Sequence, residues 1–383
     1  MAVIGIDGSI LLHGERAGKR HSRNLLGQLV RRFARDEWRL LYFDRRGSTP
    51  GRISLNPNGL DRETVSRIPM RLLSGAWRRL GCPPAENWIG PIDVFYAPDL
   101  FFPPTRSAPV LCTIRGVAYL AIPHLCEPGK VSALTDAFEY ACRRGHHFLA
   151  VSESTRQDLL RFTDLPQDRI HVVTHGVDPI FRPLDRDECR RSIARKLGVE
   201  QPFLLYVGVI GRHKNVMGIL KAYSASGVHR EGVGLVMAGP FESEIQNARS
   251  FVAQKGLEKS VCFIGNLNHE DTSLVELYNS AVALVHASFY EGWCATPLEA
   301  MACGTAVVAS DIPPVREVVQ DAAILAPPDE LDAWKDAMVR IVGDENQRSV
   351  LTEKGLSHVK QHTWKRAAKR LRRVLTTVQE MGR

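Results

Sequence analysis

Short runs of apolar residues alternate with helix-length segments along the whole chain. In the first half these runs occupy residues 3–7, 38–43, 93–97, 110–114, 148–151 and 170–173. In the second half they occupy residues 203–209, 234–238, 261–264, 281–286 and 306–309. Short apolar runs separated in this way are typical of parallel strands that helices cover on both faces. The pattern therefore predicts an α/β protein built from doubly wound parallel sheets.

The alternation is interrupted at residues 176–183, which contain one glycine and two prolines, and then restarts. Glycine and proline are typical of loops and hinges. A chain of 383 residues also exceeds the usual size of a single domain. We therefore expect two Rossmann-like domains, an N-terminal domain at 1–178 and a C-terminal domain at 179–360.

The final segment, residues 361–383, has the pattern of an amphipathic helix. Its apolar residues recur at helical spacing, and they are Trp364, Ala367, Ala368, Leu371, Val374, Leu375 and Val378. Lysine and arginine fill the positions between them. A surface helix packed on a domain is the simplest interpretation, and binding to an anionic membrane is the alternative.

The charge is distributed unevenly. The chain has 50 Lys and Arg against 42 Asp and Glu, a net charge of +8. Residues 1–178 carry 24 basic and 18 acidic side chains, residues 179–360 carry 19 and 23, and residues 361–383 carry 7 and 1. The excess suggests an anionic partner. Because no nucleic-acid-binding module or aromatic-interleaved basic motif accompanies it, we expect no nucleic acid partner.

Eight scattered cysteines form no CxxC pair, so we expect buried thiols in a reducing compartment rather than disulfides or a zinc site. The N-terminal apolar run reaches Asp7 too early for a signal peptide. No uncharged apolar run reaches the ~18 residues of a membrane span. These features predict a cytoplasmic protein.

The strongest local signal is a strand, loop, short helix and strand at residues 286–308. Thr296 is a plausible N-cap, Pro297 suits the first helical position, and Gly304 suits the helix stop. Glu299 then fits a capping box with Thr296, which is the structural interpretation of this carboxylate. A helix N-terminus at the carboxyl end of a parallel strand is also a place where anions bind.

Glu291 and Glu299, with seven residues between them, resemble the E-x7-E motif of glycosyltransferase family 4, the retaining GT-B enzymes, whose usual form is EGFGLPxLEAMACGxPVV. Further matches follow in family order at residues 5–8, 22–26, 96–104, 151–153, 175–178, 181–183, 207–208 and 214–215. The resemblance implies the GT-B fold, with two facing Rossmann-like domains and a cleft between them. It also implies that the C-terminal helix, 361–383, packs back on the N-terminal domain.

The resemblance assigns roles to three charged residues. Glu291 would contact hydroxyls of the donor sugar, and Glu299 would accept hydrogen bonds from the ribose of the nucleotide. Lys214 would place its charge on the donor diphosphate and stabilise the charge that grows there as the sugar–phosphate bond breaks. A solvated loop lysine is the simpler interpretation of Lys214.

Smaller contributions to donor binding would come from backbone and loop positions. The implied donor-binding positions are Gly8, Gly18, Gly208, Arg212, Cys294, Ala295 and Thr296. Members of this family resemble one another in needing no metal, and the sequence has no DxD motif and no clustered His and Cys ligands. We therefore expect no cofactor and no metal.

The sequence departs from the family pattern at several of these positions. Arg115 stands where the family has a histidine lining the reaction centre, and arginine can neither lose a proton nor accept a hydrogen bond there. Cys294 and Ala295 replace the usual glycine and leucine, and Val209 replaces a frequent arginine. Two interpretations stay open. Either the enzyme is active and Arg115 meets an anionic group of donor or acceptor, or the protein is a sugar-nucleotide-binding scaffold without catalysis.

As an enzyme, the chain would move a hexosyl unit, mannosyl or similar, from a UDP-, GDP- or ADP-linked donor. The acceptor would be a glycan or a lipid-linked phosphate, in cell-surface polysaccharide or glycolipid synthesis. The basic N-terminal domain and basic C-terminal helix would then face an anionic acceptor or the inner face of the cell membrane. The alternative explanation of the basic charge is a GC-rich genome, which leads to frequent use of arginine.

Overall fold

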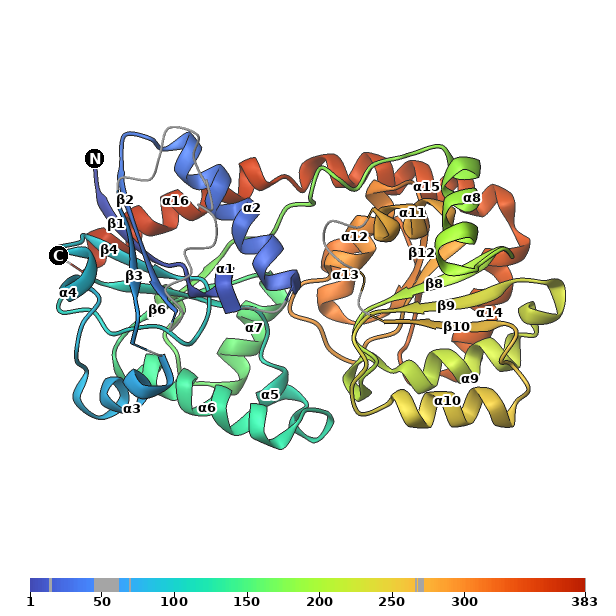
Figure 1. Ribbon diagram of the computed structural model, residues 1–383, viewed down its shortest axis with the longest axis horizontal. Coiled ribbons are helices and arrows are strands. Elements are labelled where there is room, and N and C mark those ends of the chain that lie inside the picture. The colour runs from blue at the N-terminus through green and yellow to red at the C-terminus, as the bar shows by residue number, and fades with distance from the viewer. Residues whose placement is uncertain (14–15, 45–61, 69, 266, 268–271, 383) are drawn as a thin grey trace. The chain divides into compact units, whose positions relative to one another are not determined.

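A computed structural model describes residues 1–13, 16–44, 62–68, 70–265, 267 and 272–382. The chain divides into two compact units (Figure 1). The first comprises Met1–Pro123, Glu127–Gly176 and Thr363–Arg383, and the second comprises His124–Cys126 and Val177–His362. Each unit is built around one parallel sheet.

The first unit contains a seven-stranded sheet in the order β3-β2-β1-β4-β5-β6-β7. Its strands are β1 (Val3–Asp7), β2 (Glu37–Phe43), β3 (Arg62–Ser66), β4 (Val94–Ala97), β5 (Val110–Ile114), β6 (His147–Ala150) and β7 (Ile170–Val172). Its helices are α1 (Ser9–His13), α2 (Arg16–Arg32), α3 (Met70–Leu80), α4 (Glu86–Ile89), α5 (Ala118–Ala121), α6 (Pro128–Arg143), α7 (Glu153–Phe162) and α16 (Trp364–Met381). Every pair of neighbouring strands is parallel.

The second unit contains a six-stranded parallel sheet in the order β10-β9-β8-β11-β12-β13. Its strands are β8 (Phe203–Val207), β9 (Gly234–Ala238), β10 (Val261–Ile264), β11 (Ala283–His286), β12 (Ala306–Ser310) and β13 (Ile324–Ala326). Its helices are α8 (Arg186–Leu197), α9 (Val216–Ser226), α10 (Ile245–Gln254), α11 (Ser273–Ser280), α12 (Ala295–Ala302), α13 (Pro313–Val319), α14 (Leu331–Gly343) and α15 (Glu345–His358). Short 3₁₀ turns lie at Pro123–Leu125, Gln167–Arg169, Arg212–Lys214, Val228–Glu231 and Val359–Gln361.

Alternate residues of β8 enter two different cores, which explains the doubly wound layering. Leu204 and Tyr206 lie in a core with residues of α9, α10 and α14. Phe203 and Leu205 lie in a second core with residues of α8, α11, α12 and α13. Because successive side chains of a strand point to opposite faces, a strand buried on both sides must be apolar throughout. The apolar runs in the sequence reflect this requirement.

Two strands, β3 and β13, are not among those that the sequence predicts, although β13 is the apolar tripeptide Ile324–Ala326. Both lie at the edge of a sheet, and β13 has only three residues. An edge strand has one neighbour and one less-covered side, so polar residues such as Arg62 and Glu63 are tolerated there. The run expected at 203–209 also ends early, at Val207, because Gly208 takes a φ of 157° that L-residues rarely adopt.

Helix α16 packs on the first unit beside α2 (Figure 1). Leu371 and Leu375 of α16 share a core with Leu26 and Leu29 of α2. Arg372 forms a two-pronged ion pair with the buried Asp36, with Nη2 2.9 Å from Oδ1 and Nε 2.5 Å from Oδ2. Burial opposes ionisation of Asp36, but its hydrogen bonds with Arg372 outweigh this and lower the pKa of the carboxyl. The final helix is therefore an integral part of the first unit.

All eight cysteines lie within the described ranges and are free thiols. The expectation that they are buried is wrong for Cys82, which is exposed, and only partly right for Cys126, Cys142 and Cys262, which are half-buried. Cys82 follows the end of α3, outside the apolar strands that bury Cys112. Among the described residues, no helix is long and apolar enough to cross a membrane.

Candidate functional site

A buried ion pair between Glu291 and Lys214 lies at the carboxyl-terminal edge of the second sheet. Glu291 is in the loop after β11, and Lys214 is in the 3₁₀ turn that follows β8, the strand beside β11. Lys214 Nζ is 2.5 Å from Glu291 Oε1, and the two side chains are 19% and 10% exposed. Because carboxyl ends of parallel strands meet at one edge, residues 77 positions apart in sequence converge here.

The turn that carries Lys214 is held by its neighbour. Asn215 adopts left-handed backbone angles, with a φ of 53°, and its Nδ2 donates to the carbonyl of Pro328 at 2.6 Å. Asparagine tolerates this conformation better than most residues. The Phe289 N–H also donates to the His213 carbonyl at 3.0 Å, which joins the Lys214 turn to the Glu291 loop. Lys214 is therefore fixed in the site rather than a solvated loop lysine.

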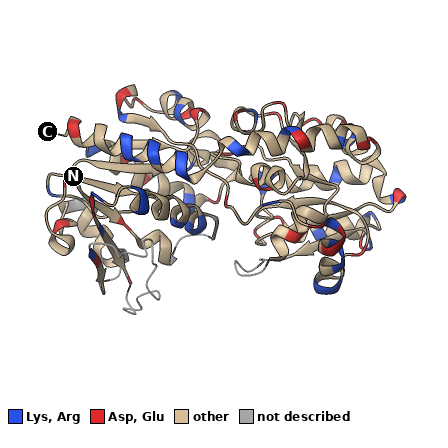
Figure 2. Ribbon diagram, turned by 90° about the horizontal axis from the view of Figure 1, so that it is seen from above, with Lys and Arg blue, Asp and Glu red and all other residues tan. Residues whose placement is uncertain are grey.

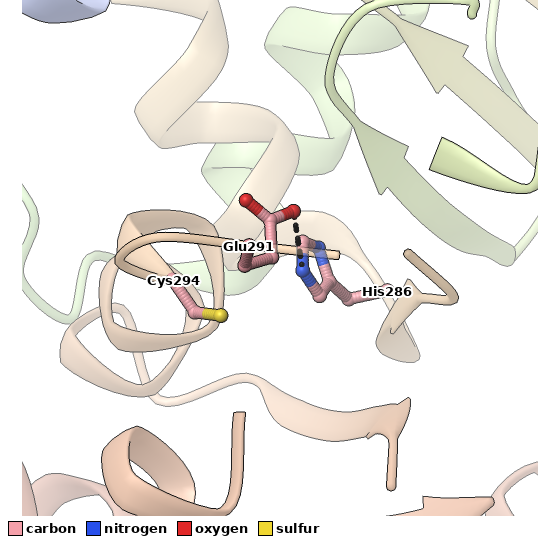
Figure 3. Close-up of side chains that lie close together, drawn as sticks. All are labelled: His286, Glu291 and Cys294. Carbon is pink, nitrogen blue, oxygen red and sulfur yellow. Dashed lines mark ion pairs between the residues drawn. The ribbon is translucent and has the colours of Figure 1, made fainter. Parts of the chain in front are cut away.

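Three donors converge on one oxygen of Glu291. Besides Lys214, the Ser288 hydroxyl donates to Oε1 at 2.7 Å and His286 Nε2 lies 3.1 Å from it. Burial opposes ionisation of the carboxyl, but the charge of Lys214, with His286, holds the pKa of Glu291 well below its ordinary value. The second oxygen, Oε2, has no hydrogen-bond partner among the described residues and points away from His286 (Figure 3). Glu291 is therefore an ionised carboxylate with one acceptor oxygen available.

His286, the last residue of β11, is a site residue that the sequence reasoning does not single out. Its side chain is 5% exposed, and Thr296 Oγ1 lies 3.2 Å from its Nδ1. The available signal was a polar residue at the end of an otherwise aliphatic strand, Ala283–His286. Such a position on a parallel strand faces the edge where sites form.

A potential metal-ligand group corrects one sequence expectation. His286, Glu291 and Cys294 place one ligand atom each within 4.8 Å of one another, although the sequence shows no such cluster (Figure 3). Lys214 already supplies a cation at Glu291. Burial, with Glu291 nearby, raises the pKa of Cys294 well above its ordinary value, so its thiol stays protonated. The carboxylate of this group is already paired with the Lys214 ammonium.

The start of α12 differs from the sequence expectation. The N-cap is Cys294, without a side-chain cap bond among the described residues, and the helix begins at Ala295. Thr296 is thus the second helical residue and Pro297 the third, so the assignments of Thr296 to the N-cap and of Pro297 to the first helical position are wrong. Thr296 could not cap because its hydroxyl contacts His286 instead. The predicted stop is confirmed, since Gly304 follows the C-cap with a φ of 75°.

Glu299 is not part of a capping box. Because α12 begins at Ala295, Glu299 lies in its second turn, and its side chain is buried against α11. Its Oε2 accepts a hydrogen bond from the Tyr278 hydroxyl at 3.0 Å. A buried carboxylate costs free energy unless it is hydrogen-bonded, and the Tyr278 hydroxyl provides one such bond to Glu299. The capping-box interpretation is therefore excluded by the position of the helix start.

Gly208 and Arg212 lie on the loop after β8. The backbones of Gly208 and Gly239 lie close together. A Cβ atom on Gly239 would be 2.0 Å from the Gly208 carbonyl oxygen. Arg212 pairs with Glu244 at 3.8 Å and is 58% exposed. An exposed pair of this length stabilises the protein little, so the Arg212 guanidinium is free to reorient. Cys294, Ala295 and Thr296 are at the start of α12, at the same edge of the sheet.

Arg115, Gly8 and Gly18 belong to the first unit. Arg115 follows β5, and its Nη2 lies 3.4 Å from both Ser22 Oγ and the Pro98 carbonyl. Among the described residues no carboxylate pairs with Arg115. Burial, and then the charge of Arg115, lower the pKa of His175 to about 3, so that ring stays neutral. Arg115 thus presents an uncompensated positive charge at the carboxyl edge of the first sheet.

The two glycines of the first unit are required by close contacts. Gly8 follows β1, and a Cβ atom there would lie 2.4 Å from the Tyr42 ring. A Cβ atom on Gly18, in the first turns of α2, would lie 2.0 Å from Arg115 Nη1. Each position thus admits only a residue without a side chain unless its neighbour moves.

Comparison with known proteins identifies the family. Residues 190–358 match the family described as glycosyl transferases group 1, and residues 21–181 match glycosyltransferase family 4. O-antigen chain mannosyltransferase B of Escherichia coli is 27% identical over 272 residues, which covers 71% of this chain and 71% of that protein.

Solved structures agree on the fold. Sucrose-phosphate synthase of Thermosynechococcus elongatus superposes with a TM-score of 0.73 at 17% identity, covering 100% of both chains. The Anabaena protein HepE, solved in complex with UDP-glucose, superposes with a TM-score of 0.72 at 14% identity, covering 98% of this chain and 100% of that one. Two parallel α/β units with these likenesses constitute the GT-B fold. The chain belongs to the group 1 glycosyltransferases of glycosyltransferase family 4.

Proposed function

We propose that this protein transfers a hexosyl unit, mannosyl or similar, from a nucleotide-sugar donor to a glycan or lipid-linked acceptor in cell-surface polysaccharide or glycolipid synthesis. The observation that carries the proposal is the buried Glu291–Lys214 pair at the carboxyl edge of the second sheet. The similarity to an O-antigen chain mannosyltransferase supports the sugar and the biological setting. It also favours an enzyme over the scaffold without catalysis.

The donor would be held at the start of α12. The first N–H groups of a helix have no intrahelical partner, so those of Ala295 and Thr296 suit the donor phosphates. Lys214 Nζ has three donor hydrogens and can bridge Glu291 and a phosphate oxygen. Glu291 Oε2 would accept a hydroxyl of the donor sugar, and Glu299 would accept the ribose hydroxyls. Gly208 and Arg212, which follow β8 in the sequence, would contact the donor from that side of the site.

Transfer would proceed with retention and without a metal. The bond from the anomeric carbon to the diphosphate oxygen breaks, and a bond to the acceptor oxygen forms on the same face of the sugar. The acceptor proton passes to the departing phosphate oxygen. Lys214 and the α12 N–H groups stabilise the negative charge that accumulates on the diphosphate. The anomeric configuration of the product, read by NMR, and unchanged turnover in EDTA test both assignments.

The first unit would contribute the acceptor side. Arg115, packed against Gly18, would supply a positive charge. It would meet a phosphate or another anionic group of donor or acceptor. Because Arg115 cannot take up a proton, its role is electrostatic rather than general base catalysis.

Contact with an anionic membrane would bring a lipid-linked acceptor to the first unit. The exposed basic residues recur along α16, with the acidic Glu380 near its end (Figure 2), and they are Lys365, Arg366, Lys369, Arg370 and Arg373. Each such residue near an anionic surface contributes about 1 kcal/mol at low salt. The protein is expected to float with liposomes that have the anionic lipid content of the inner membrane, and not with neutral liposomes. Equal recovery on both kinds of vesicle would contradict this contact.

A thermal-shift screen against UDP-, GDP- and ADP-linked sugars is the first experiment, because a bound donor raises the melting temperature. The donor that binds is then tested for transfer to glycan and lipid-linked acceptors. The proposal requires one donor that both stabilises the protein and yields a glycosylated product. Binding without any product across the acceptor panel would restore the scaffold interpretation.

A further inference from the structure

The imidazole of His286 uses both of its nitrogens within the site. Nε2 lies 3.1 Å from Glu291 Oε1, and Nδ1 lies 3.2 Å from Thr296 Oγ1. A carboxylate only accepts hydrogen bonds, so the proton must be on Nε2. At Nδ1 the ring contacts the Thr296 hydroxyl, so the three side chains form one hydrogen-bonded chain from Thr296 through His286 to Glu291.

We infer that His286 is a positioning residue, which orients Glu291 so that Oε2 alone faces the donor sugar and which links this carboxylate through Thr296 to the start of α12. The inference rests on the proposed function, because it concerns the same donor site. It adds a residue for which the sequence pattern assigns no role.

The fold does not need an imidazole at this position. The other residues of β11, Ala283, Leu284 and Val285, are aliphatic, and an apolar side chain would continue the strand. The main chain of His286 is tied separately, because the Ser310 hydroxyl donates to its carbonyl at 3.3 Å. Burying an imidazole costs free energy unless its nitrogens are hydrogen-bonded. Both nitrogens of His286 point to site residues, so the ring serves the site.

His286 is most needed when the donor is bound. Lys214, Ser288 and His286 share Glu291 Oε1. A donor diphosphate would attract the Lys214 ammonium. The contact between Lys214 and Glu291 would then weaken. His286 and Ser288 would then retain the carboxylate. Because Thr296 is the second residue of α12, the same chain of hydrogen bonds connects the sugar-facing carboxylate with the phosphate-facing helix turn.

The test measures each of several variants with each of several donor analogues. GDP-mannose and analogues that each lack one ring hydroxyl are compared in wild type, Glu291→Gln, His286→Phe, His286→Gln and the control Ser310→Ala. Wild type should discriminate strongly against the analogue whose missing hydroxyl contacts Oε2. In His286→Phe, kcat/KM for GDP-mannose should fall about tenfold to a hundredfold, the cost of a misplaced group, and the discrimination should shrink as in Glu291→Gln.

The conservative and control variants separate positioning from packing. His286→Gln, whose amide N–H can donate to Oε1, should recover most of the discrimination, whereas Ser310→Ala should keep both rate and discrimination. A merely structural role for His286 would lower the melting temperature and reduce the rate on every analogue equally. That outcome, or full wild-type discrimination in His286→Phe, would overturn the inference.

A spectroscopic readout keeps this inference separate from the proposed function. In protein labelled with ¹⁵N-histidine, the resonance absent from His286→Phe should report a ring that carries a proton on Nε2. It should shift in both Glu291→Gln and Thr296→Val. A ring protonated at Nδ1 alone, or no response to Glu291→Gln, would refute the contact with Glu291. If wild type instead transfers no sugar while these shifts appear, the proposed function fails and the His286 contact stands.

Discussion

Gly18 of α2 lies directly against the guanidinium of Arg115, so closely that a Cβ atom at residue 18 would be 2.0 Å from Nη1. The two residues are 97 positions apart in the sequence, on a helix and on the loop after β5. The guanidinium of Arg115 is thus accommodated by the absence of a side chain on residue 18. The position of the Arg115 side chain therefore depends on the absence of a side chain at residue 18.

Gly18→Ala should therefore displace Arg115. We expect kcat/KM to fall by about tenfold or more, because a shift of ~1 Å in a site group costs up to a hundredfold. In the Arg115→Ala background the same change should have little further effect, since the clash is gone. Steady-state kinetics on the four proteins measures this coupling. Gly75→Ala is the control, because no atom lies within 4 Å of a Cβ built there. Additive effects of the two changes would contradict the coupling.

Lys214→Met should remove both activity and stability. Loss of the ammonium that faces the diphosphate should lower kcat by about a hundredfold to a thousandfold. It should also destabilise the fold by about 3 kcal/mol, because Glu291 would be left as a buried charge without its cation. The double variant Lys214→Met/Glu291→Gln should regain stability but not activity. Denaturant unfolding and turnover assays test the two effects.

Lys221→Met is the matched control, since Lys221 is exposed on α9. It should leave both unfolding and turnover unchanged. Stability in Lys214→Met equal to that of wild type would mean that Lys214 does not compensate Glu291 in solution.

Arg372→Met should loosen α16 from the first unit. Its ion pair with Asp36 is mostly buried, with side chains 17% and 7% exposed, so its loss should destabilise the protein by about 3 kcal/mol. Arg373→Met, one residue along and exposed, should cost less than ~0.5 kcal/mol. Thermal unfolding compares the pair. Equal melting temperatures for the two variants would show that the Asp36 contact does not anchor the helix.

Asp7 should make the stability fall as pH rises toward neutrality. Burial raises the pKa of Asp7 to about 7 from its ordinary value of 3.8. A pKa raised in the folded state means that the folded protein binds the extra proton between these values. Its stabilising contribution is complete below about 4 and lost by pH 7, at about 1 kcal/mol per pH unit. Asp7→Asn should remove this contribution, so the stability of the variant relative to that of wild type should rise between about pH 4 and pH 7. An unchanged slope in urea titrations from pH 4.5 to 7.5 would contradict it.

Local patterns in the sequence accounted for most of the framework. The run 234–238 corresponds residue for residue to β9, because a strand buried on both faces must be apolar at every position. The run 261–264 likewise matches β10, an apolar strand at the edge of the second sheet. The edge strand β3 was missed because an edge strand need not be apolar, and β13 was missed as an apolar run of only three residues. The stop of α12 at Gly304 was also readable, because a left-handed residue there favours glycine.

The site is different, because its geometry depends on contacts between distant parts of the chain. Glu291 and Lys214 were named from a resemblance, but their pairing, and the third contact from His286, arise only where β8 and β11 lie side by side. Thr296 looked like an N-cap from spacing alone, yet its hydroxyl is taken by His286, a residue ten positions earlier that folding brings into contact with it. Sequence spacing encodes which residues share an element. The convergence of side chains at a sheet edge is set by strand order, which no local pattern contains.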